Sequence, residues 1–137
     1  MKRFVWFVLM TFGLILAACG GGAEQPAAKI DLNALAETVD VQTVAAIKDD
    51  PGVIVLDVRE QYEYDEGHIP GVVLIPMAEI ANRLREIPAD KQVIVTCRSG
   101  NRSGQVTQFL LEQGFDNVHN MEGGILAWQA AGLAVEQ

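Results

Sequence analysis

The sequence predicts a single α/β domain built on a parallel β-sheet with helices on both faces. Three apolar runs are continuous rather than alternating, which is the pattern of strands buried on both sides: Val53–Leu56, Val72–Ile75 and Val93–Val95. Amphipathic segments lie between them, and this alternation of strands and helices is typical of parallel sheets. The chain has 137 residues, half of them apolar, so one domain can build its own core.

The first residues of the chain have the pattern expected of a targeting signal. Met1–Arg3 is positive, and Phe4–Ala18 is an apolar run shorter than the roughly 20 residues of a membrane-spanning helix. It ends in Leu16–Cys19 (LAAC), which resembles the lipobox of bacterial lipoproteins. This resemblance implies that residues 1–18 are a signal peptide, removed when the Cys19 thiol is acylated. The alternatives are an uncleaved anchor and a plain secretory signal.

Acylation would attach an exported protein to a lipid bilayer, at the outer face of the cell membrane or in the periplasm or outer membrane, since two acyl chains suffice for stable anchoring. Residues 19–37 would then be the lipidated cysteine and a flexible tether, and residues 38–137 the domain. Loss of Lys2 and Arg3 would change the formal charge from −8 to −10. Such an acidic chain argues against nucleic acid as a partner.

Capping residues and apolar spacing define the predicted helices. Asp40 is placed to cap a helix at Val41–Lys48, and Pro88 ends a helix whose apolar face includes Ile80 and Leu84. A helical turn is predicted at Leu32–Glu37. The predicted helices, in chain order, are Val41–Lys48, Glu60–Glu66, Ala78–Ile87, about Gly104 to Gln113, and Ile125–Ala131. A fourth strand, with a weaker apolar pattern, is predicted at Asn117–Met121.

The stretch Cys97–Ser103 (CRSGNRS) lies where the third apolar run ends, and sites in parallel sheets gather at the carboxyl ends of strands. Helix N-termini stabilise thiolates and lower a cysteine pKa from near 8.5 to about 3.5–7.5. Two arginines add positive charge, and small residues let the backbone form an anion-binding nest. The predicted site is Cys97 as nucleophile, with Arg98, Ser99, Gly100, Asn101, Arg102 and Ser103 around the substrate.

These residues predict nucleophilic cysteine chemistry on a small oxyanion or sulfur-rich anion; an inert buried cysteine is the alternative. If Cys19 is acylated, Cys97 is the only free thiol. His68 and His119 are too few and too widely separated to complete a zinc site with one thiol. We therefore expect no metal and no other cofactor.

CRSGNRS is similar to the active-site loop of single-domain rhodaneses, and two further stretches agree with that family. Leu56–Glu60 followed by Gly67–Gly71 resembles the family's DVRE…GHIPGA signature, with Val72 in place of the common small residue. Met121–Trp128 resembles the closing GG…AW element. The resemblance covers about Thr38 to the C-terminus and implies a five-stranded, mostly parallel sheet.

The resemblance also implies a sulfurtransferase. Cys97 would attack the outer sulfur of thiosulfate, a polysulfide or a persulfide, and the resulting Cys97 persulfide would pass its sulfur to cyanide or a thiol. Arg98 is expected to point toward the donor and Arg102 to shape the loop. Asp57 and Arg59 are expected to pair with neighbours and fix loops around the site.

Two other functions stay open. Some phosphatases share the rhodanese fold, and a phosphatase or arsenate reductase would need a C-x-x-x-x-x-R loop. The stretch from Cys97 to Arg102 is one residue shorter, and a tighter cradle suits one sulfur atom better than a phosphate. A non-catalytic sulfur carrier or binding module differs from an enzyme mainly in its partner, which the sequence does not name.

Overall fold

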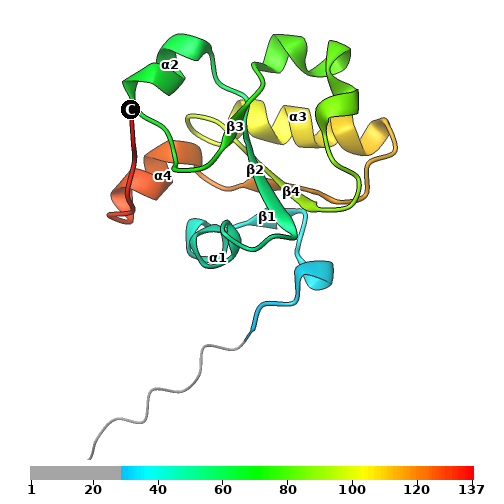
Figure 1. Cartoon of the computed structure of the whole chain (residues 1–137), viewed down its shortest axis with the longest axis horizontal. Coiled ribbons are helices and arrows are strands. Elements are labelled where there is room, and N and C mark those ends of the chain that lie inside the picture. The colour runs from blue at the N-terminus through cyan, green and yellow to red at the C-terminus, as the bar shows by residue number, and fades with distance from the viewer. Residues whose placement is uncertain (1–28) are drawn as a thin grey trace, which may run out of the picture.

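The computed structural model describes residues 29–137 of the chain (Figure 1). The expected signal peptide, Cys19 and most of the expected tether lie outside these residues. Within residues 29–137, no helix has the length and apolar composition needed to cross a bilayer.

Five parallel strands form one sheet in the order β1-β5-β4-β2-β3. The strands are β1 (Thr38–Val39), β2 (Val53–Asp57), β3 (Val73–Leu74), β4 (Gln92–Thr96) and β5 (Val118–Met121). The five-stranded sheet implied by the resemblance is confirmed, and four of its strands match apolar runs in the sequence. The expectation that all of these strands are buried on both sides is wrong for β3, which is an edge strand with Val73 exposed. β1 consists of Thr38 and Val39 and lies in no apolar run, whereas the equally short β3 lies within the run Val72–Ile75, so β1 could not be identified before its pairing with β5 was known.

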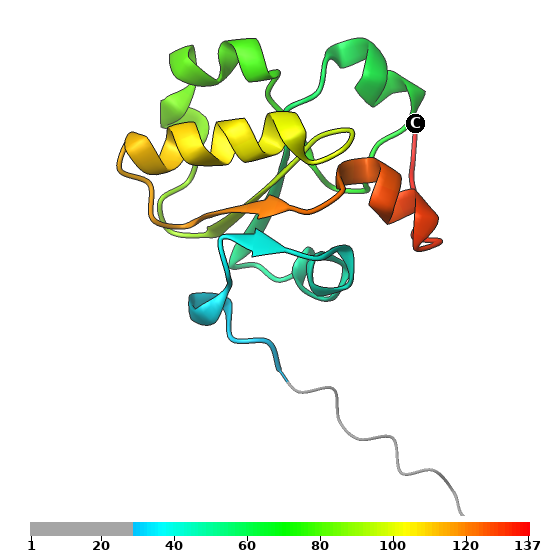
Figure 2. The same ribbon diagram turned by 180° about the vertical axis from the view of Figure 1, so that it is seen from behind.

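Helices cover both faces of the sheet, as predicted. They are α1 (Val41–Ile47), α2 (Gln61–Glu66), α3 (Asn101–Glu112) and α4 (Gly124–Ala130), with 3₁₀ turns at Leu32–Ala34, Met77–Asn82 and Leu84–Glu86. On one face, Val44 of α1 and Trp128 of α4 pack with the inward side chains of β2 and β4. On the other, Val106 and Leu110 of α3 form a second core cluster. Figures 1 and 2 show α1 and α3 on opposite sides of the sheet.

Two helices differ from their predicted form. The segment predicted as an α-helix at Ala78–Ile87 is two 3₁₀ turns, because its backbone bonds join residues three apart, such as the Arg83 N–H to the Ile80 carbonyl at 3.0 Å. Its apolar face is nonetheless correct, since Ile80 and Ile87 are buried. The helix expected from Gly104 begins at Asn101, which places Asn101, Arg102 and Ser103 in its first turn.

The N-terminal part of the described chain packs on the domain. Residues 29–37 belong to the segment assigned to the tether, but Ile30, Leu32 and Leu35 contact the core cluster beneath α1 and α4. The apolar side chains explain this packing, since they remove hydrocarbon from water. The folded unit therefore extends N-terminally beyond residue 38.

The sheet places two connecting loops side by side. Asp57 and Thr96 are register partners at the ends of β2 and β4. The backbone continues the contact, since the Val58 N–H donates to the Thr96 carbonyl at 2.9 Å. The loop after β2 and the loop that begins at Cys97 thus leave the sheet at the same edge.

Candidate active site

The loop between β4 and α3 wraps around the sulfur of Cys97. The Gly100 N–H donates to Sγ at 3.1 Å, and the Ser103 hydroxyl donates to it at 3.3 Å. Gly100 has φ +93°, a left-handed conformation that only glycine adopts readily, and this turns its N–H toward the sulfur. Cys97 itself is almost fully buried, so the loop and the sheet enclose the thiol.

These contacts lower the pKa of the Cys97 thiol. Burial raises that pKa, but hydrogen bonds from the Ser103 hydroxyl and from the backbone N–H groups of Ser103, Ser99 and Gly100 outweigh burial. Donors aimed at the sulfur favour its anion, whether thiolate or persulfide. Backbone N–H groups of the loop thus face the Cys97 sulfur, and the Ser103 hydroxyl donates to it as well.

The two arginines of the loop have different environments. Arg102 donates from Nη1 and Nη2 to the two carboxylate oxygens of Glu63 in α2, at 2.7 Å each. The Arg102 guanidinium lowers the pKa of Glu63 to about 2, so the pair stays ionised at neutral pH. By contrast, Arg98 is exposed and takes part in no ion pair within residues 29–137. Arg98 is therefore free to meet an anion, whereas Arg102 ties the loop to α2.

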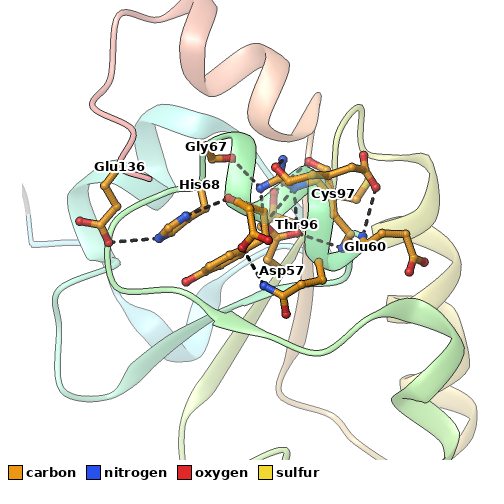
Figure 3. A network of polar contacts seen from close by, with 12 residues as sticks. Asp57, Glu60, Gly67, His68, Thr96, Cys97 and Glu136 are labelled. Carbon is orange, nitrogen blue, oxygen red and sulfur yellow. Dashed lines mark hydrogen bonds and ion pairs between the residues drawn. The ribbon is translucent and has the colours of Figure 1, made fainter.

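A buried ion pair between Asp57 and Arg59 holds α2 in position. Asp57 accepts hydrogen bonds from Nε and Nη2 of Arg59 at 2.9 and 2.7 Å, with both side chains nearly inaccessible. Arg59 also donates to the carbonyls of Glu63, within α2, and Gly67, its C-cap, at 2.9 Å each, and so holds the helix in place. Figure 3 shows Asp57, Gly67 and Cys97 in this network. Asp57 and Arg59 thus support the loop through α2 and Glu63.

The first turn of α4 packs closely against the backbone of Cys97 and Arg98. The Ile125 N–H donates to the Cys97 carbonyl at 2.8 Å, and the Leu126 N–H to the Arg98 carbonyl at 3.1 Å. A Cβ on Gly124 would lie 2.6 Å from the Arg98 carbonyl carbon. Glycine at this position is therefore a steric requirement.

We expect Gly124→Ala to destabilise the fold and to lower turnover, because the added methyl group displaces the backbone of Cys97 and Arg98. Gly132→Ala is the matched control: Gly132 also has a left-handed φ, +72°, but a Cβ there meets nothing within 4 Å. The control should lose only about 1–2 kcal/mol for the strained backbone. Urea unfolding measures the stability of both variants, and the rate of sulfur transfer measures their activity. Equal losses of stability in the two variants would contradict the steric argument.

A cleft of ≈ 390 Å³ opens over the Arg98 side of the loop. Its walls come from α2 and α4, and it is lined by Arg59, Tyr62, Glu63, Glu66, Gly67, Arg98, Ile125, Leu126 and Gln129. Within residues 29–137, no three His, Cys, Asp or Glu side chains come together as a metal site. The arrangement is thus an enclosed sulfur beside an open cleft, and Arg98 is the cation in the cleft lining that forms no ion pair with the described residues.

Sequence reasoning missed one contributor to the site, Glu63, and the partners of His68. Glu63 lies 39 residues from Arg102 in the chain, and only its place in a Glu60–Glu63 capping box gave any local signal. His68 stacks on Tyr64, and its backbone pairs with Glu136 in an antiparallel bridge, drawing the C-terminal tail beside α2 (Figure 3). Neither partner of His68 could be inferred from its position in the sequence.

Comparison with known proteins identifies the family. A model described as rhodanese-like domain matches residues 40–131. A sulfurtransferase of Allochromatium vinosum is 40% identical over 89 residues, covering 65% of this chain and 83% of the relative. Thiosulfate sulfurtransferase GlpE of Pseudoalteromonas translucida is 34% identical over 93 residues, covering 68% of this chain and 89% of the relative.

Solved structures agree with this assignment. A rhodanese-related protein from Thermoplasma volcanium superimposes with a TM-score of 0.67 at 31% identity, over 74% of this chain and 98% of that one. A thiosulfate sulfurtransferase from Pseudomonas aeruginosa gives a TM-score of 0.67 at 33% identity, over 73% of this chain and 20% of that one. The chain therefore belongs to the rhodanese-like family.

Proposed function

We propose that the protein is a sulfurtransferase that moves a sulfane sulfur from thiosulfate or a similar donor, through a Cys97 persulfide, to a thiol or cyanide. The observation that carries this proposal is the pair of donors on the Cys97 sulfur, the Gly100 N–H and the Ser103 hydroxyl. They favour an anion at Sγ without an adjacent general base. The sulfurtransferase names of the relatives support the same reaction class.

In the first step the Cys97 thiolate attacks the outer sulfur of the donor. A bond forms between Sγ and that sulfur, the bond to the sulfonyl group breaks, and sulfite leaves with the electron pair. The loop N–H groups then hold the persulfide anion. In the second step an acceptor thiolate or cyanide attacks the outer sulfur, and the Cys97 thiolate leaves and is held again by the same donors.

The direct test is transfer of sulfur from thiosulfate to cyanide by the purified protein, followed as thiocyanate. Turnover that requires the Cys97 thiol supports the proposal. Absence of thiocyanate with thiosulfate, polysulfide and organic persulfide donors alike would contradict it.

A phosphatase or arsenate reductase is disfavoured by the state of Arg102. Such enzymes need the loop arginine to hold a tetrahedral oxyanion, but both outer nitrogens of Arg102 are bonded to Glu63. A sulfur carrier is the stronger second candidate. A putative sulfur carrier protein of Bacillus subtilis is 36% identical over 100 residues, with this chain covering 50% of it. Stable persulfide formation without release to cyanide or small thiols would favour the carrier.

Arg98 is the proposed donor-binding cation. We expect Arg98→Ala to raise the KM for thiosulfate by about 10-fold, because a charge-assisted contact to the donor is lost. Stability should be unchanged, since Arg98 is exposed and unpaired. Arg85→Ala, at an exposed arginine outside the lining of the cleft, is the control. A KM that stays the same in Arg98→Ala would exclude Arg98 as the donor contact.

We also propose that Cys19 anchors the protein in the cell envelope. The support is the LAAC sequence after a positive start and an apolar run. In a bacterial host the wild type should partition into the detergent phase of a Triton X-114 extract, and Cys19→Ala should lose this partitioning. A wild-type protein found wholly in the aqueous phase would contradict the anchor.

A further inference from the structure

We propose that the cleft between α2 and α4 selects singly charged organic sulfane donors over inorganic thiosulfate, with Tyr62 and Leu126 as the specificity-determining residues. The donor class is R–SO₂–S⁻ or R–S–S⁻ in which R is an apolar group. This inference rests on the proposed sulfurtransferase function and specifies the substrate of the same site.

The size of the cleft favours an organic donor. Its volume of ≈ 390 Å³ falls within the range of about 300–1,000 Å³ typical of sites for small organic molecules. Thiosulfate is a small anion and would occupy only part of that space. The remainder would hold several water molecules, since each takes about 30 Å³ in the liquid. A donor with an aryl or alkyl substituent fills the cleft beyond its sulfur.

The charged side chains that line the cleft can neutralise one negative charge on a bound donor. Arg59 is paired with Asp57, and Glu63 with Arg102, so these four groups balance each other. The other charged groups in the lining are Arg98 and Glu66. Arg98 can therefore neutralise one anionic group, whereas a second charge on thiosulfate would face Glu66 without a counter-charge in a chain of formal net charge −8.

The apolar side chains at the mouth supply the complementary surface. Residues 29–137 contain four large hydrophobic residues that are exposed: Tyr62, Val73, Leu126 and Val135. Two of them, Tyr62 with 66% and Leu126 with 43% of their surface exposed, line this one cleft from opposite walls. Ile125 adds apolar surface beside Leu126. An apolar substituent lying between these walls would remove hydrocarbon from water on both sides.

The sulfur transfer itself needs no further reactant. The Cys97 thiolate attacks the terminal sulfur of R–SO₂–S⁻, and a new bond forms from Sγ to that sulfur. The bond between the two donor sulfurs breaks, and the electron pair leaves with the sulfinate R–SO₂⁻. Two negative charges enter the step and two leave it, one on the persulfide and one on the sulfinate, so no proton or oxidant is consumed.

The test compares benzenethiosulfonate with methanethiosulfonate, which share the reacting group and differ in the apolar substituent. In the wild type we expect kcat/KM for the phenyl donor to exceed the values for the methyl donor and for thiosulfate by about 10-fold or more, from burial of the ring. The double variant Tyr62→Ala/Leu126→Ala should lose this ratio, because kcat/KM falls for the phenyl donor and much less for the methyl donor. Val73→Ala removes an equally exposed side chain, 43%, from the sheet edge, and should leave the ratio unchanged.

The outcomes separate this inference from the proposed function. Equal use of the two thiosulfonates by the wild type, or a ratio that survives in the double variant, overturns the role of Tyr62 and Leu126 while sulfur transfer stands. Absence of a Cys97 persulfide with all three donors overturns the sulfurtransferase function and this inference together. A double variant that loses thiosulfate turnover as well would show that the two residues support the loop, and would also overturn their role in specificity.

Discussion

Cys97→Ser is expected to lower sulfur turnover by at least about 1,000-fold, the scale seen when a catalytic nucleophile is removed. The reason is chemical, because a serine hydroxyl at neutral pH is neither ionised nor able to form a persulfide. The donors that hold the Cys97 sulfur, the Gly100 N–H and Ser103 hydroxyl, would remain in place around the serine. The measurement is the rate of thiocyanate formation from thiosulfate and cyanide.

Serine is a close steric match for cysteine, so the fold should survive this change. The urea midpoint and the circular dichroism spectrum of Cys97→Ser should therefore match those of the wild type. If the folded variant kept more than about a tenth of the wild-type rate, nucleophilic catalysis by Cys97 would be excluded.

Asp57→Ala is expected to have the largest effect on stability, about 3–5 kcal/mol in the free energy of unfolding, the usual cost of leaving a buried charge unpaired. Arg59 has 4% of its surface exposed, so its guanidinium cannot turn to water. It would keep only the carbonyls of Glu63 and Gly67 as acceptors. Because Arg59 holds α2, and α2 holds Arg102 through Glu63, turnover should fall along with stability. Urea unfolding measures the first effect and thiocyanate formation the second.

Glu79→Ala is the matched control for this prediction. It also removes a carboxylate paired with an arginine, Arg83, but that pair lies on the surface. Exposed pairs contribute about 0–1 kcal/mol, so the control should be nearly as stable as the wild type. Similar losses of unfolding free energy in Asp57→Ala and Glu79→Ala would contradict the structural role of the buried Asp57–Arg59 pair.

The parts of the fold that the sequence predicted are those with strong local signals. The strands β2 and β4 appeared as unbroken apolar runs, and the helix start at Asp40 as a capping residue whose side chain accepts the Thr43 N–H at 2.7 Å. The position of Cys97 at the end of a strand was also predicted from a local signal, the apolar run that precedes it. Each of these signals arises within a few residues, where backbone hydrogen bonding and burial are decided together.

Features that depend on distant partners could not be predicted. The different environments of Arg98 and Arg102 depend on Glu63, which reaches the loop only when α2 is placed over it. The 3₁₀ form of residues 77–86 was hidden because i, i+4 and i+7 spacing fits a buried face regardless of the hydrogen-bond pattern. The bridge between His68 and Glu136 joins segments that carry no shared sequence signal.

Intact mass after incubation with a sulfane donor tests the central claim most directly. The protein is treated with thiosulfate or a thiosulfonate, freed of donor and weighed, beside Cys97→Ser treated in the same way. We predict a gain equal to the mass of one sulfur atom in the wild type, reversed by cyanide and absent from the variant. A wild type that gains no sulfur from any donor, or a variant that gains it equally, would contradict a persulfide at Cys97.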